Sequence, residues 1–514
     1  MEDVSKKYKL TVGVEVHAEL KTKTKMFCSC LNDPDVSRPN INVCPICMGH
    51  PGTLPVPNRK AIEAVIKVGM ALACDIAEHS HFDRKNYFYP DLPKGYQITQ
   101  YEEPFCRNGK LAVPGSPAIV RINRIHLEED TGKSIHSKDA TLLDFNRAGV
   151  PLMELVTEPD LHSATDVKKF CEELQLMLRY LGVSDADMEK GHMRCEANIS
   201  VSKTDEFGKK VEVKNLNSFK AVERAIEYEC KRHIEALENG EKVVQETRGW
   251  DDGKGVTYSQ RSKEEAHDYR YFPEPDIPPL SIFQNEHAAG ADEEAIFIDA
   301  LRSELPELPA SRRERFLREY GLAPDQIEIF TVQKPIGDYF EGVASELASE
   351  HDRGEFSSLD ASRQETGDDL THLIGLHKLA ANYLINDLPR ALTEAGTDFA
   401  DLKISAENFA EFVLRIEKGV LSSASARTVL TQMLQTGADP DEIIRDKNLA
   451  QISDTGELEV VVAKLIEDNP LVVEDFKKGK QNALQFFVGQ VMKETKGKAN
   501  PKVAQELLRK KLSS

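Results

Sequence analysis

The sequence has no long hydrophobic run, no surplus of positive charge and no even set of cysteines. No apolar stretch approaches the roughly eighteen residues that a membrane span needs, so we expect no membrane association. The first residues, MEDVSKKYKL, lack the apolar segment of a signal peptide, which predicts a cytoplasmic protein. A net charge of −20 argues against a surface covered with nucleic-acid-binding residues, although it leaves room for one local basic patch.

Nine cysteines are an odd number, and four of them fall between Cys28 and Cys47. Such crowding argues for a metal site in a reducing compartment rather than for disulfides. The pairs Cys28/Cys30 and Cys44/Cys47 are separated by thirteen residues. Because each close pair can take one edge of a tetrahedron, the spacing predicts a structural zinc knuckle.

A second interpretation of the same region is a zinc-dependent deaminase. His17-Ala-Glu19 followed by Cys44-x-x-Cys47 is similar to the H-x-E…P-C-x-x-C pattern, in which zinc activates a water molecule. Val43 stands where that pattern has proline, His17 lies in a strand pattern, and Cys28 and Cys30 would have no role. The zinc knuckle is therefore favoured.

The stretch Leu10–Leu20, LTVGVEVHAEL, alternates between apolar and polar residues. Alternate side chains of a strand point to opposite faces, so the pattern predicts a strand with its even-numbered residues in a core. The other face carries Glu15, His17 and Glu19 in one row, with about 6.6 Å between alternate residues.

Three later stretches repeat this design, namely Arg124–Asp130, Arg194–Val201 and Val211–Lys214. One acidic strand face is ordinary, but several that share a sheet would gather carboxylates around a hard cation. From residue 292 onward the pattern is helical, and residues 345–369 are rich in acids and serines, which predicts a flexible insertion. Ten basic residues against two acids follow Phe476.

Eight sequence blocks, in chain order, resemble the B subunits (GatB family) of the tRNA-dependent amidotransferases. They are VGVEVHAEL, FDRKNYFYPDLPKGYQI, RIHLEEDTGKS, NRAGVPLMELVTEPD, RCEANIS, VEVKNLNSF, QETRGW and DYRYFPEPDIPPL. The resemblance implies an α+β fold, with an antiparallel-sheet catalytic cradle, flanking helices and a zinc knuckle over residues 1–292. The resemblance then implies an all-α domain over residues 293–402, which includes the acidic insertion 345–369. The last part would be an all-α basic tail over residues 403–514 that contacts tRNA.

The resemblance also implies a reaction. The family uses ATP and magnesium to phosphorylate the side-chain carboxylate of Glu-tRNA(Gln) or Asp-tRNA(Asn), and ammonia then converts it to the amide. The ammonia comes from glutamine through a separate amidase (glutaminase) subunit, and a third, small subunit completes the heterotrimer. This sequence has no Gly-Gly-Ser-Ser amidase signature, in agreement with a separate ammonia source.

Carried over residue by residue, the family's magnesium and phosphoryl-transfer site falls on five positions. These are Glu15, His17, Glu129, Glu196 and Glu212. Lys85 matches a residue near the ammonia passage, and Cys28, Cys30, Cys44 and Cys47 match a zinc knuckle that only some members possess. Alternation places Glu129 with the apolar Ile125 and Leu127, so either a bulge redirects it or Glu128 is the ligand.

A different class of function is compatible with the same residues. In a non-catalytic tRNA-binding scaffold, the acids would be surface groups and the basic tail would do the binding. The repetition of acids on strand faces favours the enzyme.

Overall fold

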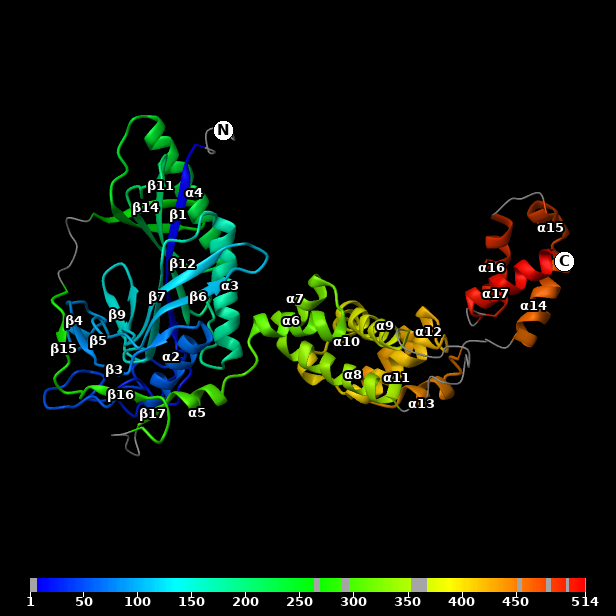
Figure 1. Cartoon of the computed structure of the whole chain (residues 1–514), viewed down its shortest axis with the longest axis horizontal. Coiled ribbons are helices and arrows are strands. Elements are labelled where there is room, and N and C mark those ends of the chain that lie inside the picture. Colours follow the sequence, from blue (N-terminus) through cyan, green and yellow to red (C-terminus); the bar gives the residue numbers. More distant parts are fainter. Residues whose placement is uncertain are drawn as a thin grey trace. The chain divides into compact units, whose positions relative to one another are not determined.

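The computed structural model describes residues 7–262, 269–288, 295–352, 368–450, 455–477, 482–495 and 499–513. The chain forms two compact units, Met1–Pro309 and Ala310–Ser514 (Figure 1). The first unit combines a large sheet with helices and the second is helical. The α+β fold expected from the sequence is therefore confirmed.

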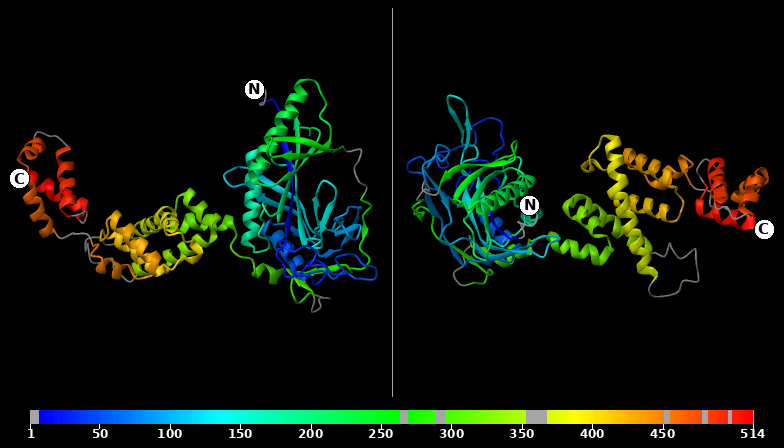
Figure 2. Two further views of the ribbon diagram at one scale, coloured as in Figure 1. Left: turned by 180° about the vertical axis from the view of Figure 1, so that it is seen from behind. Right: turned by 90° about the horizontal axis from the view of Figure 1, so that it is seen from above.

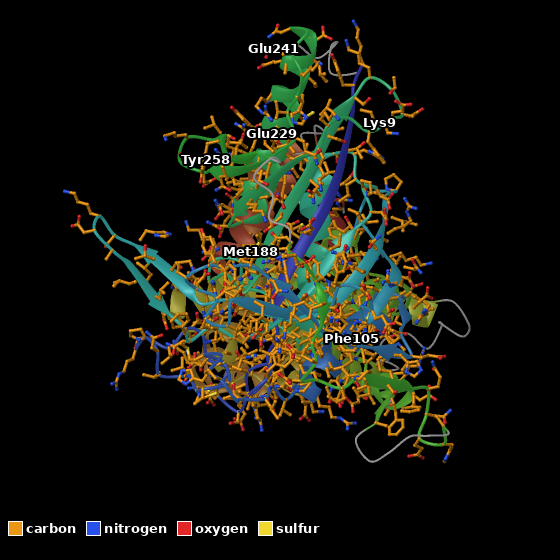
Figure 3. All side chains as sticks on the ribbon, turned by 90° about the vertical axis from the view of Figure 1, so that its left-hand side faces the viewer. Lys9, Phe105, Met188, Glu229, Glu241 and Tyr258 are labelled. Atoms are coloured by element: carbon orange, nitrogen blue, oxygen red, sulfur yellow. The ribbon has the colours of Figure 1, made fainter. Side chains whose placement is uncertain are left out.

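A nine-stranded sheet is the framework of the first unit. Its strands, in spatial order, are β14 (Val256–Ser262), β13 (Glu246–Asp251), β12 (Val211–Leu216), β11 (Met193–Ser202), β1 (Lys9–Glu19), β10 (Pro151–Thr157), β7 (Ile119–Glu129), β6 (Cys106–Ala112) and β2 (Asp75–Ile76). All neighbours are antiparallel except β12 and β13. The stretch predicted at Leu10–Leu20 is the central strand, and it runs from Lys9 into the middle of the unit (Figure 3).

Three helices cover the apolar face of this sheet. They are α2 (Arg59–Ala71), α3 (Ala164–Tyr180) and α4 (Phe219–Glu238). The even-numbered residues of β1 from Val12 to Ala18 are at most 1 % exposed in the common core, as the alternation predicts. Ser163 and Ser218 cap α3 and α4 by accepting a backbone hydrogen bond.

Short strands and one short helix complete the first unit, and several of these strands lie to the left of the large sheet in Figure 1. They are β3 (His79–Ser80), β4 (Asp83–Asn86), β5 (Tyr96–Thr99), β8 (Lys133–His136), β9 (Thr141–Asp144), β15 (Phe272–Pro273), β16 (Leu280–Phe283) and β17 (Ile296–Phe297), followed by helix α5 (Ile298–Ser303). The carboxylate of Glu129 accepts the backbone N–H of Ile98, which ties β5 to β7. The Arg59 guanidinium of α2 donates to the carbonyl oxygen of Ala295, which places β17 and α5 beside α2.

The second unit is built from helices, which Figure 2 shows from behind and from above. They are α6 (Pro309–Tyr320), α7 (Pro324–Val332), α8 (Lys334–Asp352), α9 (Asp368–Asn382), the π-helix η2 (Tyr383–Asp387), α10 (Leu388–Ala395), the 3₁₀ helix η3 (Phe399–Asp401), α11 (Ala406–Glu417), α12 (Ser423–Thr436), α13 (Pro440–Asp446), α14 (Thr455–Asp468), α15 (Pro470–Lys477), α16 (Asn482–Glu494) and α17 (Pro501–Ser513). Ser405 caps α11 by accepting the backbone N–H of Asn408.

Two hydrophobic cores hold these helices. One runs from Phe316 to Ile444 and the other from Leu458 to Leu512. The first core includes both Phe340 and Phe409, so it crosses the boundary between residues 402 and 403 that the sequence suggested. The three-part division of the chain stays a prediction.

The predicted insertion 345–369 begins inside a helix rather than in a flexible segment. Helix α8 continues to Asp352 because Leu347 extends its apolar stripe and is fully buried. Residues 353–367 of that prediction lie outside the described residues, and its last two residues, Asp368 and Asp369, begin helix α9. Within the described parts of the chain, no helix is long and apolar enough to cross a membrane.

Candidate active site

The polar face of β1 supplies the middle of a row of charged side chains. His17 lies opposite Arg194 of β11 and opposite Glu154 of β10. Glu154 in turn lies opposite His126 of β7. Because directly opposed residues on one face of a sheet lie about 4.5–5.5 Å apart, the register alone gathers these side chains.

The first group at this row consists of His17, Glu128 and Glu154, whose ligand-type atoms lie within 4.8 Å of one another. His17 Nε2 lies 3.3 Å from the Glu154 carboxylate and 3.8 Å from that of Glu128. His126 Nε2 approaches Glu154 at 3.4 Å. Both carboxylates are buried.

Charge within this group is tightly coupled. Burial by itself lowers the pKa of His17, but a hydrogen bond with Glu154 and the negative charges of Glu154 and Glu128 outweigh it and raise that pKa to about 9. Burial opposes ionisation of Glu154, yet the charge of His126 and the hydrogen bond with His17 hold its pKa below the ordinary value. Buried charges of this kind are tolerated only when they are paired or hold a cation.

The second group consists of Glu15, Glu196 and Glu212, from β1, β11 and β12. Burial, followed by the negative charges of Glu154 and Glu196, raises the pKa of Glu15. Lys214 donates to Glu196 at 2.7 Å and lies 3.3 Å from Glu212, so one ammonium contacts two of the three carboxylates of this group. This excess of oxygen anions suits a hard divalent cation.

The partners of these carboxylates fix their directions. Thr247 of β13 donates its hydroxyl to Glu212 at 2.7 Å, and Asn198 donates to Glu15 at 2.9 Å. The parallel pairing of β12 with β13 places Thr247 opposite Glu212. The second group is therefore held by hydrogen bonds from two neighbouring strands.

Glu129, which the resemblance selected, lies in neither group. Its carboxylate accepts the backbone N–H of Ile98 at 2.9 Å and pairs with the Lys94 ammonium. It lines a cavity of about 220 Å³ together with Lys94 and Cys47. The register of β7 with β10 is regular from Arg124 to Glu129, so no bulge redirects the side chain, and the structure brings Glu128 to the group instead.

Lys85 of β4 lies beside the first group. Its ammonium is 5.0 Å from the centre of the Tyr269 ring. Burial lowers the pKa of Lys85, but the negative charge of Glu128 is among the effects that raise it above the ordinary value. The structure thus brings Lys85 toward the acidic row, and its expected place near an ammonia passage stays a prediction.

Sequence reasoning missed Glu154 and His126. Glu154 interrupts the otherwise apolar strand PLMELVT, and a lone acid in a buried strand was the signal that could have identified it. His126 shares the strand face of Glu128, which alternation shows once Glu128 is chosen.

The four cysteines form a separate group, with their sulfur atoms within 4.8 Å of one another. Sγ of Cys44 and Sγ of Cys47 are 3.9 Å apart. A tetrahedral zinc ion with bonds of about 2.3 Å separates its sulfur ligands by about 3.8 Å, so the group could hold zinc. Hydrogen bonding from the Cys28 thiol, against the effect of burial, is the main cause that lowers the pKa of Cys47 to about 5.

The separation of these groups bears on the deaminase interpretation. That chemistry needs a histidine and two cysteines around one zinc ion. Here His17 groups with Glu128 and Glu154, whereas Cys44 and Cys47 group with the other two cysteines. Among the described residues, the geometry gives a deaminase centre no support.

The fold and site define an α+β protein with two adjoining oxygen-rich groups that could hold cations on one sheet, and a distinct four-thiol group. Residues 10–288 match the family described as "GatB/GatE catalytic domain", and residues 368–512 match the "GatB domain". The chain belongs to the GatB family.

Curated relatives match over nearly the whole chain. The chain is similar, at 44 % identity over 99 % of both sequences, to the B subunit of the aspartyl/glutamyl-tRNA(Asn/Gln) amidotransferase of Carboxydothermus hydrogenoformans. The protein with the same description from Caldanaerobacter subterraneus is 44 % identical over 99 % of this chain and 100 % of its own. That from Thermotoga maritima is 43 % identical over 98 % of this chain and 99 % of its own.

Proposed function

We propose that this chain is the component of an aminoacyl-tRNA amidotransferase that activates the misacylated residue. Its substrate is the side-chain carboxylate of Glu-tRNA(Gln), Asp-tRNA(Asn) or both, which ATP phosphorylates. Ammonia from the amidase (glutaminase) subunit then gives Gln-tRNA(Gln) or Asn-tRNA(Asn), and a third, small subunit completes the complex. Near-complete coverage of relatives described as the B subunit of such an amidotransferase supports this proposal.

The observation that carries the proposal is the presence of two three-ligand groups that share strand β1. Glu15, Glu196 and Glu212 would hold one magnesium ion, and His17, Glu128 and Glu154 would hold a second. Magnesium prefers oxygen ligands and is held by a few carboxylates together with substrate phosphates. A bound magnesium ion neutralises phosphate charge, which is the main requirement for phosphoryl transfer.

The remaining charged residues have distinct tasks in this proposal. Lys214 balances part of the charge of Glu196 and Glu212, so that their ligand atoms stay together before substrate binds. Lys85, at the edge of the row, would face the entering ammonia and the carboxylate that is being activated. Aromatic rings beside Lys85, such as that of Tyr269, would help to exclude water and so protect an acyl phosphate from hydrolysis.

Glu212→Gln in the assembled enzyme tests the proposal. It keeps the shape of the side chain and removes one negative charge, so the protein should fold and bind tRNA. We expect tRNA-dependent ATP hydrolysis and amide formation to fall on the order of a hundredfold or more. Glu206→Gln, in the exposed turn between β11 and β12, is the matched control and should change neither rate.

The two rates also separate the enzyme from a tRNA-binding scaffold. In a scaffold, Glu212→Gln would leave both rates within about threefold of the parent, a difference of about 0.7 kcal/mol. That result at saturating magnesium would contradict the assignment of Glu212 as a metal ligand. Uncoupled glutamine hydrolysis by the amidase partner should survive in either case.

A further inference from the structure

A fully buried lysine lies against the four-thiol site. Lys25 is 0 % exposed, and its backbone N–H donates to the carbonyl of Cys30. Its ammonium donates to the carbonyl oxygen of Phe145 at 3.1 Å and lies 4.0 Å from Sγ of Cys47. The side chain thus joins the cysteine segment to the loop that precedes β10.

The Lys25 ammonium contacts no carboxylate of the residues that the structure describes. Among the described residues, no Asp or Glu oxygen lies within 4.0 Å of Lys25 Nζ. An unpaired buried charge is among the most costly features of a protein interior. The group with anionic character that its ammonium contacts is the sulfur cluster, through Cys47.

The metal-loaded site would have an excess of negative charge, whereas the lysine carries a positive charge. Four thiolates around one Zn²⁺ carry a net charge of −2, partly shielded from water, because Cys47 is buried and the other three cysteines are half-buried. The backbone N–H of Cys44 donates to Sγ of Cys47 at 3.2 Å but contributes no full charge. Groups outside the ligand shell commonly tune a metal site, and a cation next to an anionic ligand set stabilises it.

We propose that Lys25 is the built-in counter-charge of the four-cysteine metal site. It stabilises the thiolate, metal-loaded form, and through Phe145 it anchors that form to the segment leading into β10. The lysine and the metal complex balance each other: without metal the ammonium lacks an anion, and without the ammonium the complex carries a larger uncompensated charge. This inference does not depend on the reaction proposed above.

Lys25→Met tests the proposal, because methionine fills the site without charge. Zinc affinity of the full chain is measured by competition with a chromophoric chelator. We expect a 10- to 100-fold loss of zinc affinity, the usual effect of removing a group that supports metal ligands. Lys21→Met is the control, because the Lys21 side chain is 63 % exposed and pairs with Asp185 rather than with a cysteine. Zinc affinity of Lys25→Met within about twofold of the parent would overturn the proposal.

A double-mutant cycle separates charge from packing. Cys47→His replaces one thiolate by a neutral ligand and lowers the charge of the zinc complex from −2 to −1. Lys25→Met should then weaken zinc binding less in the Cys47→His background than in the parent. An equal loss in both backgrounds would show that Lys25 acts by packing alone and would overturn the proposal.

Lys25→Arg and Lys25→Gln replace Lys25→Met if that variant does not fold. Arginine keeps the charge and should retain zinc better than glutamine, which keeps only the hydrogen-bonding ability. If Lys25→Gln binds zinc at least as tightly as Lys25→Arg, charge compensation is contradicted.

Discussion

The two units of the chain fill their interiors with different chemistry. The sheet unit buries acids and histidines beside its central strand, among them His126, Glu128 and Glu154. The helical unit buries aromatic rings, such as Phe330 and Phe340, which stack with 4.7 Å between ring centres. No Asp or Glu among its described residues is buried.

This difference suggests that the buried groups of the sheet unit serve a reaction, whereas those of the helical unit serve stability. Burying an ionised group is costly, so a fold that concentrates such groups on one strand face retains them for a purpose other than stability. Aromatic rings that pack edge to face or stack contribute to stability, but they supply no ionisable group for a reaction. The comparison predicts that substitutions in the helical core act on unfolding, whereas substitutions on the sheet's polar face act on the reaction.

The largest expected effect on stability lies in the helical core. Phe340 is fully buried, so Phe340→Ala should lower the free energy of unfolding of the helical unit by about 3–5 kcal/mol. Hydrogen exchange measured by mass spectrometry should show faster exchange in α8 and α11 and unchanged exchange in β1. Equal acceleration in both units would contradict the separation of their cores.

Glu154→Gln should have the opposite profile. It removes a buried charge that His17 and His126 both contact, so tRNA-dependent ATP cleavage should fall at least about a hundredfold, near 3 kcal/mol of transition-state stabilisation. Glu341→Gln in the helical unit is the control, because Glu341 is also paired with two arginines, Arg312 and Arg315. If both variants keep full activity, the polar face of β1 is not the reaction site.

A smaller effect concerns pH. Burial lowers the pKa of His377 from 6.5 to about 4. As the pH falls, His377 therefore binds a proton in the unfolded chain before it does so in the folded one. The free energy of unfolding is unaffected by this group above about pH 6.5, and it falls by roughly 2–3 kcal/mol as the pH is lowered toward about 4. Urea unfolding of the helical unit should show this loss in the parent and not in His377→Phe, which keeps a ring against Tyr320. The same pH slope in both proteins would contradict the assignment.

The smallest expected effect is electrostatic and concerns the tail. The basic residues after Phe476 are Lys477, Lys478, Lys480, Lys493, Lys496, Lys498, Lys502, Arg509, Lys510 and Lys511, of which Lys478, Lys480, Lys496 and Lys498 lie outside the described residues. A chain ending at Ala450 should bind tRNA more weakly and with a shallower dependence on salt. Each lost phosphate contact should reduce the logarithmic slope by roughly 0.7–0.9. Identical slopes with and without the tail would show that it meets no phosphates.

The end point of that truncation depends on the structure. A cut before Lys403, the start of the tail in the sequence-based division, would remove Phe409 and Phe412 from the core that contains Phe340. Such a chain would lose stability and tRNA binding together, and the two effects could not be told apart. A cut after Ala450 leaves that core complete.

Local patterns in the sequence predicted much of this protein. Alternation in Leu10–Leu20 identified the central strand and its polar face, because the two-residue period is a property of a single strand. Alternation in the stretch Arg124–Asp130 indicated Glu128, where the resemblance indicated Glu129.

Only the tertiary structure decided which of these residues meet. Glu154 reaches His17 because β10, far from β1 in the sequence, pairs with it, and Thr247 reaches Glu212 because β12 and β13 run parallel. Lys25 reaches Cys47 because of how the loop after β1 folds, and that loop has no periodic pattern of apolar residues from which the contact could be predicted. Strand neighbours and loop contacts are set by the packing of the whole unit, which no local window of sequence contains.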